Sequence, residues 1–352
     1  MSQFGIQPSR LGQQNLAGDQ NTLFLKVFAG EVLSVFEETN VMMPLHTVRT
    51  ISSGKSAQFP AMATANASYH TPGESVLQQD VTNVIDGAQG SEALTQTAVN
   101  KYLSRIKHSE VVITINDLLQ SSTFIANIDE AKNHYDVRSE YSRQMGFALA
   151  NKADKMLILH GLTGARRTVD RFGGTDYLGA SVNAGGNDAI TPDELLDGIF
   201  DAAQAFDEKD VPSADRYCVV APREYYGLIN GTSDAINRDY GNDGNGSVAS
   251  GMIMSVAGIR IVKSNHLAQA TDYVTEAGDN STLSGTYDFT GTGNEPAALI
   301  FQRSALGTVK LLDLAVESDY QVERQGTLMV AKYAMGHDTL RTEALYELKQ
   351  GA

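Results

Sequence analysis

The sequence predicts an α+β fold organised around one very long helix. Residues 128–160 place apolar side chains three or four positions apart, at Ile128, Ala131, Tyr135, Met145, Leu149, Met156 and His160. Such a helix would span roughly 50 Å, about three times the length of a typical globular helix. An extended β-prone segment precedes it, and alternating helices and strands follow it. A rod of this length suits a flat, extended subunit better than a compact enzyme.

Charge and glycine content suggest where this helix begins and ends. Asp129 and Glu130 would lie in its first turn, where negative charge complements the helix dipole. Gly161 follows the last periodic residue and is expected to stop the helix. Residues 162–188 are rich in glycine and are expected to form a loop.

The segment before the long helix is expected to be an extended β-excursion spanning residues 51–115. Residues 49–60 are small and β-prone, and residues 106–115 alternate as a returning strand does. An isolated two-stranded hairpin is only marginally stable in water. The excursion is therefore expected to lean on a neighbouring subunit.

Near the N-terminus, residues 22–36 are amphipathic with an unusually wide apolar face that includes Phe24 and Phe28. A short helix with so few polar positions needs a partner surface. The preceding residues 1–20 are polar and are expected to be flexible in isolation.

The second half of the chain predicts a mixed module followed by C-terminal strands. Thr191, Pro192 and Glu194 form a capping box with proline at the first helical position. The helix that they open is expected to run to about Lys209. A further helix is expected at residues 222–230, with strands at residues 217–221, 259–263, 298–301, 309–316 and 326–334.

Composition limits the possible partners. The 352 residues are enough for about two domains. The net charge is −15, from 42 acidic and 27 basic side chains, which argues against tight nonspecific binding to phosphate backbones. No apolar run approaches the roughly 20 residues that cross a bilayer, and no signal peptide is visible. We therefore expect no membrane partner and synthesis in the cytoplasm.

No catalytic, cofactor-binding or metal site is expected. Cys218 lies in an apolar, strand-like run and is interpreted as a buried structural thiol. The string SSGKS at residues 52–56 ends as a phosphate-binding loop does, but Arg49 stands where that loop needs glycine. The seven histidines form no pair at helical spacing. Two alternatives stay open: a soluble two-domain α/β enzyme whose acidic residues meet only in space, and a tail or adaptor protein.

Seven strings along the chain carry a resemblance to a known family. They are LFLKVFAGEVL (23–33), RTISSGKSAQFP (49–60), IKHSEVVITI (106–115), NHYDVRSEY (133–141), VPSADRYC (211–218), RSALGTVKL (303–311) and AKYAMGH (331–337). Each string alone is weak, but their order and separations together are specific. Together they resemble the major capsid proteins of short-tailed bacteriophages of the autographivirus (podovirus) type.

The resemblance implies the Hong-Kong-97-type capsid fold. In that fold residues 1–50 would be the N-terminal arm and residues 51–115 the extended E-loop. Residues 116–190 and 302–352 would form the peripheral domain with its spine helix. Residues 191–301 would form the axial domain.

The resemblance also implies a structural function. The chain would build an icosahedral shell of hexamers and pentamers, with a scaffolding protein and a portal as partners. The shell would enclose double-stranded DNA without sequence-specific binding. It would be part of the virion capsid and be assembled in the host bacterial cytoplasm. The candidate inter-subunit contacts are Phe24, Phe28, Arg49, Phe59, Lys107, Arg138 and Glu140.

Replacing Phe24 and Phe28 together with aspartate should leave folded subunits but block assembly, because charge would prevent the apolar face of residues 22–36 from docking. Electron microscopy of the assembly products measures the particle yield. A normal yield from the double variant would contradict a docking role for this segment.

Overall fold

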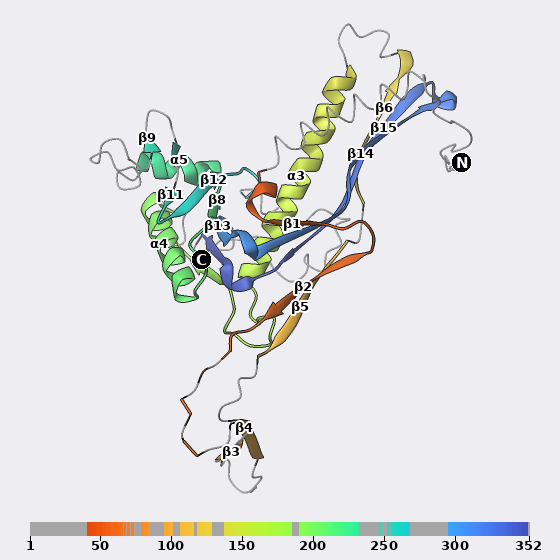
Figure 1. The fold of residues 1–352 in the computed structure, drawn as a ribbon. Helices are drawn as coiled ribbons and strands as arrows, with labels where there is room; N and C mark the ends of the chain where they lie inside the picture. Colours follow the sequence, from red (N-terminus) through yellow and green to blue (C-terminus); the bar gives the residue numbers. More distant parts are fainter. Residues whose placement is uncertain are drawn as a thin grey trace, which may run out of the picture.

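In the computed structural model, one long helix connects a four-stranded and a six-stranded β-sheet (Figure 1). It describes residues 41–65, 67, 69–70, 72–73, 76, 79–84, 95–100, 106–115, 118–128, 137–184, 190–231, 246–247, 252–253, 255–267 and 295–350. Residues 22–36, predicted to be amphipathic, lie outside this part of the chain. Helices and strands both contribute to the cores, so the fold is α+β.

The long helix is α3, Val137–Ala165, with 29 residues and a length of about 44 Å. Met145 and Leu149, on the predicted apolar stripe, are 5% and 2% exposed. Ile128 does not join this stripe, because its side chain is 61% exposed. Residues 129–136, including the predicted first turn, lie outside the described residues.

Gly161 does not end the helix, which continues to Ala165. A Cβ atom at Gly161 would lie 2.6 Å from Leu299 Cδ2, and one at Gly164 would lie 2.6 Å from Leu345 Cδ1. Both glycines therefore let the helix approach the strands beneath it closely. The stop prediction was wrong because a glycine that allows close packing and a glycine that caps a helix look alike in sequence.

The first sheet has four strands in the order β1-β14-β15-β6. Strands β14 and β15 form a long antiparallel hairpin, and β1 pairs parallel with β14 at the edge (Figure 1). The N-terminal half of α3 packs Met145, Leu149 and Ala153 against this sheet. The strand bounds are β1 Thr47–Thr50, β6 Leu119–Ala126, β14 Leu306–Gln321 and β15 Gly326–Thr339.

The second sheet has six strands in the order β11-β12-β8-β13-β16-β7. Every residue of β13 is buried, which explains its continuous apolar sequence. The strand bounds are β7 Ala180–Asn183, β8 Arg216–Val220, β11 Ser255–Val256, β12 Ile259–Lys263, β13 Pro296–Gln302 and β16 Leu345–Lys349.

Helices cover both faces of the six-stranded sheet. Glu347 on β16 points to the α3 side, where Arg166 binds it, and the neighbouring Leu348 points to Gly198 on α4. Helix α4, Pro192–Glu208, begins with the predicted capping box, in which Thr191 Oγ1 accepts from Glu194 N at 3.3 Å. Helix α5 is Pro222–Gly231, and both helices confirm the sequence prediction.

The six-stranded sheet crosses the domain boundaries expected from the sequence. Strands β7 and β16, expected in the peripheral domain, pair with each other, and β16 pairs with β13. Residues 162–188 are also not one loop, because α3 takes their first four residues and β7 lies within them. The short elements are η1 Met43–Leu45, η2 Arg303–Ala305, η3 Val322–Arg324, η4 Thr342–Ala344, β9 Gly246–Ser247 and β10 Met252–Ile253.

Gly164→Ala should lower the free energy of unfolding by about 1–3 kcal/mol, because the added methyl group overpacks the helix against the sheet. Gly227→Ala in α5 is the matched control, since its Cβ would meet only Pro192 Cγ at an ordinary 3.6 Å. The control should be neutral or more stable by up to about 1 kcal/mol. Urea unfolding of the unassembled subunits measures both, and equal effects would contradict the packing role of Gly164.

Candidate inter-subunit surfaces

A β-hairpin extends away from both sheets. Strand β2, Ser56–Met62, pairs antiparallel with β5, His108–Thr114, which confirms the two predicted strands. Further along the same excursion, β3, Gln79–Val84, pairs with β4, Thr95–Asn100. In Figure 1 this excursion reaches well beyond the body at the bottom of the view.

The base of this hairpin belongs to the core of the subunit. Ala57, Val111 and Ile113 pack against Val309 of β14 and Ala334 of β15. The outer part is exposed, with Met62 at 70%. The hairpin therefore has a fixed root and an outer part that the described body leaves uncovered.

At the root, strand β5 lies directly against the backbone of β15. A Cβ atom at Gly336 of β15 would meet Thr114 O at 2.5 Å. Since that oxygen belongs to the backbone, any larger residue at Gly336 would push the hairpin off the sheet.

Residues 168–179, which we call the bracing loop, hold the hairpin from the side. Thr64 N donates to Tyr177 Oη at 3.2 Å, and Thr64 Oγ1 shares a second hydrogen bond of 2.9 Å with the same oxygen. Ser109 Oγ on β5 donates to Arg171 O at 3.1 Å. Both strands of the hairpin are therefore tied to one loop.

Asp170 gives the bracing loop its shape. Its Oδ1 accepts from the backbone N–H groups of Phe172 and Gly174, both at 2.8 Å, and its Oδ2 accepts from Tyr177 N at 3.3 Å. Burial alone would raise the pKa of the Asp170 carboxyl, but these N–H groups outweigh burial and lower the pKa. Phe172 packs edge-on against the Tyr177 ring at 5.3 Å between centroids.

The structure brings two of the predicted contact residues together within one subunit. The Arg49 guanidinium lies 5.6 Å from the centre of the Phe59 ring, and Arg49 Nη1 donates to Gln58 O at 3.3 Å. Lys107 is exposed at the start of β5, where its carbonyl oxygen accepts from Ala63 N at 2.9 Å. Arg49 and Phe59 lie near the hairpin root, whereas Lys107 lies at the outer end of β5.

The other predicted contact residues are elsewhere. Arg138 and Glu140 lie in the first turn of α3, at the end of that helix away from the hairpin (Figure 1). Phe24 and Phe28 lie outside the described residues. The sequence analysis missed Tyr177, Thr64 and Asp170. The one available signal was the string DRFGG, in which an aspartate and two glycines are typical of a side-chain-stabilised turn.

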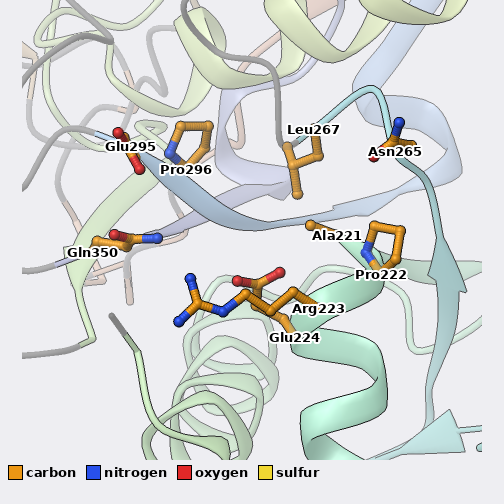
Figure 2. A pocket seen from close by; sticks show the side chains of 9 residues that line it. All are labelled: Ala221, Pro222, Arg223, Glu224, Asn265, Leu267, Glu295, Pro296 and Gln350. Carbon is orange, nitrogen blue, oxygen red and sulfur yellow. The ribbon is translucent and has the colours of Figure 1, made fainter. Parts of the chain in front are cut away.

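A cavity of about 380 Å³ lies at the N-terminal end of α5 (Figure 2). Burial raises the pKa of the Glu224 carboxyl within it. None of the lining residues that the structure describes is a histidine or a cysteine. Its lining residues are Ala221, Pro222, Arg223, Glu224, Asn265, Leu267, Glu295, Pro296 and Gln350.

The sequence strings that could have carried chemistry have structural explanations. Cys218 is 0% exposed in β8, and burial raises the pKa of its thiol to about 12, so it is not a thiolate nucleophile. Gly54 has φ +105° in the turn between β1 and β2. The string SSGKS leads into strand β2 and not into a helix, as a phosphate-binding loop would. Among the described residues no group of histidine, cysteine or acidic side chains could hold a metal ion. No helix in that part of the chain is long and apolar enough to cross a membrane.

Comparison with known proteins identifies the architecture. Residues 90–349 match the family described as Gp10A-like major capsid protein. The chain belongs to this family of major capsid proteins. It is 35% identical over 348 residues to the major capsid protein of Escherichia phage T7, covering 93% of this chain and 92% of that protein.

Solved structures agree with this assignment. The capsid structure of the cyanophage P-SCSP1u is similar, with a TM-score of 0.66 and 37% identity over 99% of both chains. The mature capsid of bacteriophage PhiM1 has a TM-score of 0.64 at 16% identity, covering 88% of this chain and 87% of that chain, and shows the shared fold alone. The predicted Hong-Kong-97-type fold is therefore confirmed. The chain is a structural subunit of a phage capsid and not an enzyme.

Tyr177→Phe should loosen the hairpin by about 0.5–1 kcal/mol, because it removes the hydroxyl that Thr64 contacts. The measurement is hydrogen exchange of the Ala63 amide, which donates to Lys107 O and should exchange faster when the hairpin loosens. Tyr69→Phe is the matched control, since Tyr69 is fully exposed. Similar exchange in the two variants would show that the bracing loop does not hold the hairpin.

Proposed function

We propose that this major capsid protein assembles into hexamers and pentamers of an icosahedral shell through its hairpin and its N-terminal segment. The observation that supports this most is the hairpin, whose root is buried in the subunit while its outer part is not. Two-stranded sheets are marginal alone, and their free edges readily pair with other chains. A neighbouring copy of the chain is the expected partner of the outer hairpin.

The N-terminal segment leaves the body at a defined point. The carboxylate of Asp154 on α3, which is 0% exposed, accepts from Val41 N at 2.9 Å and from Met42 N at 3.3 Å. Met42 and Leu45 are buried in the core of the six-stranded sheet. Residues 1–40 thus start from a fixed anchor, which supports their role as an arm towards a neighbour.

The sheets suggest a domain division that differs from the sequence boundaries. The peripheral part would comprise the four-stranded sheet with the N-terminal half of α3. The axial part would comprise the six-stranded sheet with α4 and α5. The hairpin of residues 51–115 keeps its role as the E-loop. In this division β7 and β16 move to the axial part.

The remaining partners follow from the family and from charge. We propose that the shell forms in the host bacterial cytoplasm with a scaffolding protein and a portal. Inside it, the double-stranded DNA genome would be enclosed without sequence-specific binding. The net charge of −15 supports this, because an acidic protein repels packed phosphates instead of binding them.

Removing the outer hairpin tests the proposal. Met62 and His108 are paired across the two strands, so they can be joined by a two-residue Asn-Gly turn in place of residues 63–107. The shortened subunit should fold, because the apolar contacts of Ala57, Val111 and Ile113 remain. It should not form closed shells in electron micrographs.

The full-length chain, with and without its scaffolding partner, is the control and should give closed shells. The thermal unfolding transition of the shortened subunit verifies its fold. Closed shells of normal size from the shortened subunit would rule out the hairpin as an essential contact. Open tubes or rings from the full-length chain with its scaffolding partner would contradict the proposed assembly into a closed shell.

A further inference from the structure

A buried chain of hydrogen bonds connects the residue before β1 to the middle of the four-stranded sheet. His46 Nδ1 lies 2.8 Å from Met42 O, and His46 Nε2 lies 2.6 Å from Thr308 Oγ1 on β14. Thr308 Oγ1 lies 2.8 Å from His337 Nδ1 on β15. His46 is 1% exposed and Thr308 is 0% exposed, whereas His337 is partly buried.

The partners of this chain fix where its protons lie. Met42 O can only accept, so His46 Nδ1 must donate to it, and in the neutral ring His46 Nε2 is then an acceptor. The Thr308 hydroxyl therefore donates to His46, and its oxygen accepts from His337 Nδ1. The bond from the Thr308 hydroxyl to His46 Nε2 is satisfied only while the His46 ring is neutral, whereas His337 Nδ1 donates in either protonation state.

A proton added to His46 breaks this order. Its Nε2 would become a donor facing the Thr308 hydroxyl hydrogen, so that hydroxyl would have to rotate away and give up its bond to His46. The Thr308 oxygen has two lone pairs and could then accept from both His46 Nε2 and His337 Nδ1. Protonation therefore leaves a buried charge on His46 and a Thr308 hydroxyl hydrogen without its acceptor, and both are unfavourable.

The surrounding charges oppose protonation of His46. Burial is the main cause that lowers the pKa of His46 to about 4, and the cations Lys310 on β14 and Arg303 on η2 add to it. Met42 O and the carboxylate of Asp154 on α3 act in the opposite direction but do not outweigh burial.

The charges around His337 act in the same direction. Burial and the neighbouring His160, His46 and Lys310 lower the pKa of His337 well below its ordinary value. The His160 ring on α3 lies 6.4 Å from that of His337. On the same strand as His337, the Asp338 carboxylate lies 4.0 Å from His160 Nδ1 and 3.5 Å from Arg167 Nη2, a cation that also attracts it.

Strand β1 depends strongly on this chain of bonds. Among the strands that the structure describes, it pairs only with β14, and three of its four side chains are exposed. Apolar burial therefore contributes little to holding it. The strand also connects directly to the turn that leads into β2, where Arg49 contacts Phe59.

We propose that His46, Thr308 and His337 form a pH-sensitive latch, which holds β1 on β14 at neutral pH and releases it on acidification. Release of β1 would loosen the root of the hairpin while Met42 and Leu45 stay in the core. The latch lies within one subunit, so it does not depend on the proposed assembly.

The direction of the pH effect follows from linkage. Above a pH of about 6.5, His46 is neutral whether β1 is held or released. Between about 6.5 and the lowered value of about 4, the released form binds a proton that the held form does not. His46 therefore favours release by up to about tenfold per pH unit in this range.

Hydrogen exchange of the full-length, unassembled chain tests the latch. Between a pH of about 7 and about 5, exchange of the Ile51 amide, which donates to Lys310 O, should rise by at least about tenfold after correction for intrinsic rates. The amides of β13 should remain protected. Equal acceleration of β13 would mean that the whole fold opens, and this would overturn the proposal.

Variants assign the effect to the latch. His46→Gln should reduce the pH dependence, whereas His108→Gln, at an exposed histidine on β5, should retain it. A wild-type pH profile in His46→Gln would overturn the proposal. If this variant does not fold, hydrogen exchange at the imidazole C2 position of the wild-type chain decides. Titration of His46 at an ordinary pKa of about 6.5 would then overturn it.

Discussion

The structure depends on one helix that belongs to two hydrophobic cores. The N-terminal half of α3 buries Met145 and Leu149 against the four-stranded sheet, and its C-terminal half buries Leu157 and Leu162 against the six-stranded sheet. Because a helix is stiff along its axis, the two sheets keep a fixed relation across a span that neither core could bridge alone. The placement of one end of the extended subunit then determines the placement of the other end, which a shell with defined geometry requires.

Close packing and a buried ion pair strengthen the contact between α3 and the six-stranded sheet. Beyond the packing glycines of α3, Arg166 binds Glu347 through two hydrogen bonds of 2.7 and 2.6 Å, and Ser181 donates to the same carboxylate at 2.8 Å. Since Glu347 is 0% exposed, its charge requires all of these partners. One carboxylate thus ties the end of the helix to both β16 and β7.

Local patterns in the sequence predicted the helices and strands, but contacts between residues far apart in the sequence could not be predicted from it. The Thr191 capping box and the alternation in residues 106–115 are local signals, and both elements form as predicted. Gly161 was misread because its role is set by Leu299, which is far away in sequence. The pairing of β16 with β13 was hidden for the same reason. In the candidate surfaces, Arg49 and Phe59 were predicted separately, whereas the brace by Tyr177 depends on a contact that only the folded chain creates.

These features separate the stable part of the subunit from the part that remains for neighbours. Both sheets pack with α3 into hydrophobic cores that are buried within one chain. The hairpin shares the body's core only at its root, and the bracing loop fixes its departure without covering it. A fixed root with an uncovered outer part restricts the direction of the hairpin while leaving its free edges for another copy. This combination favours specific assembly over indiscriminate aggregation, because only a neighbour placed in that direction can pair with those edges.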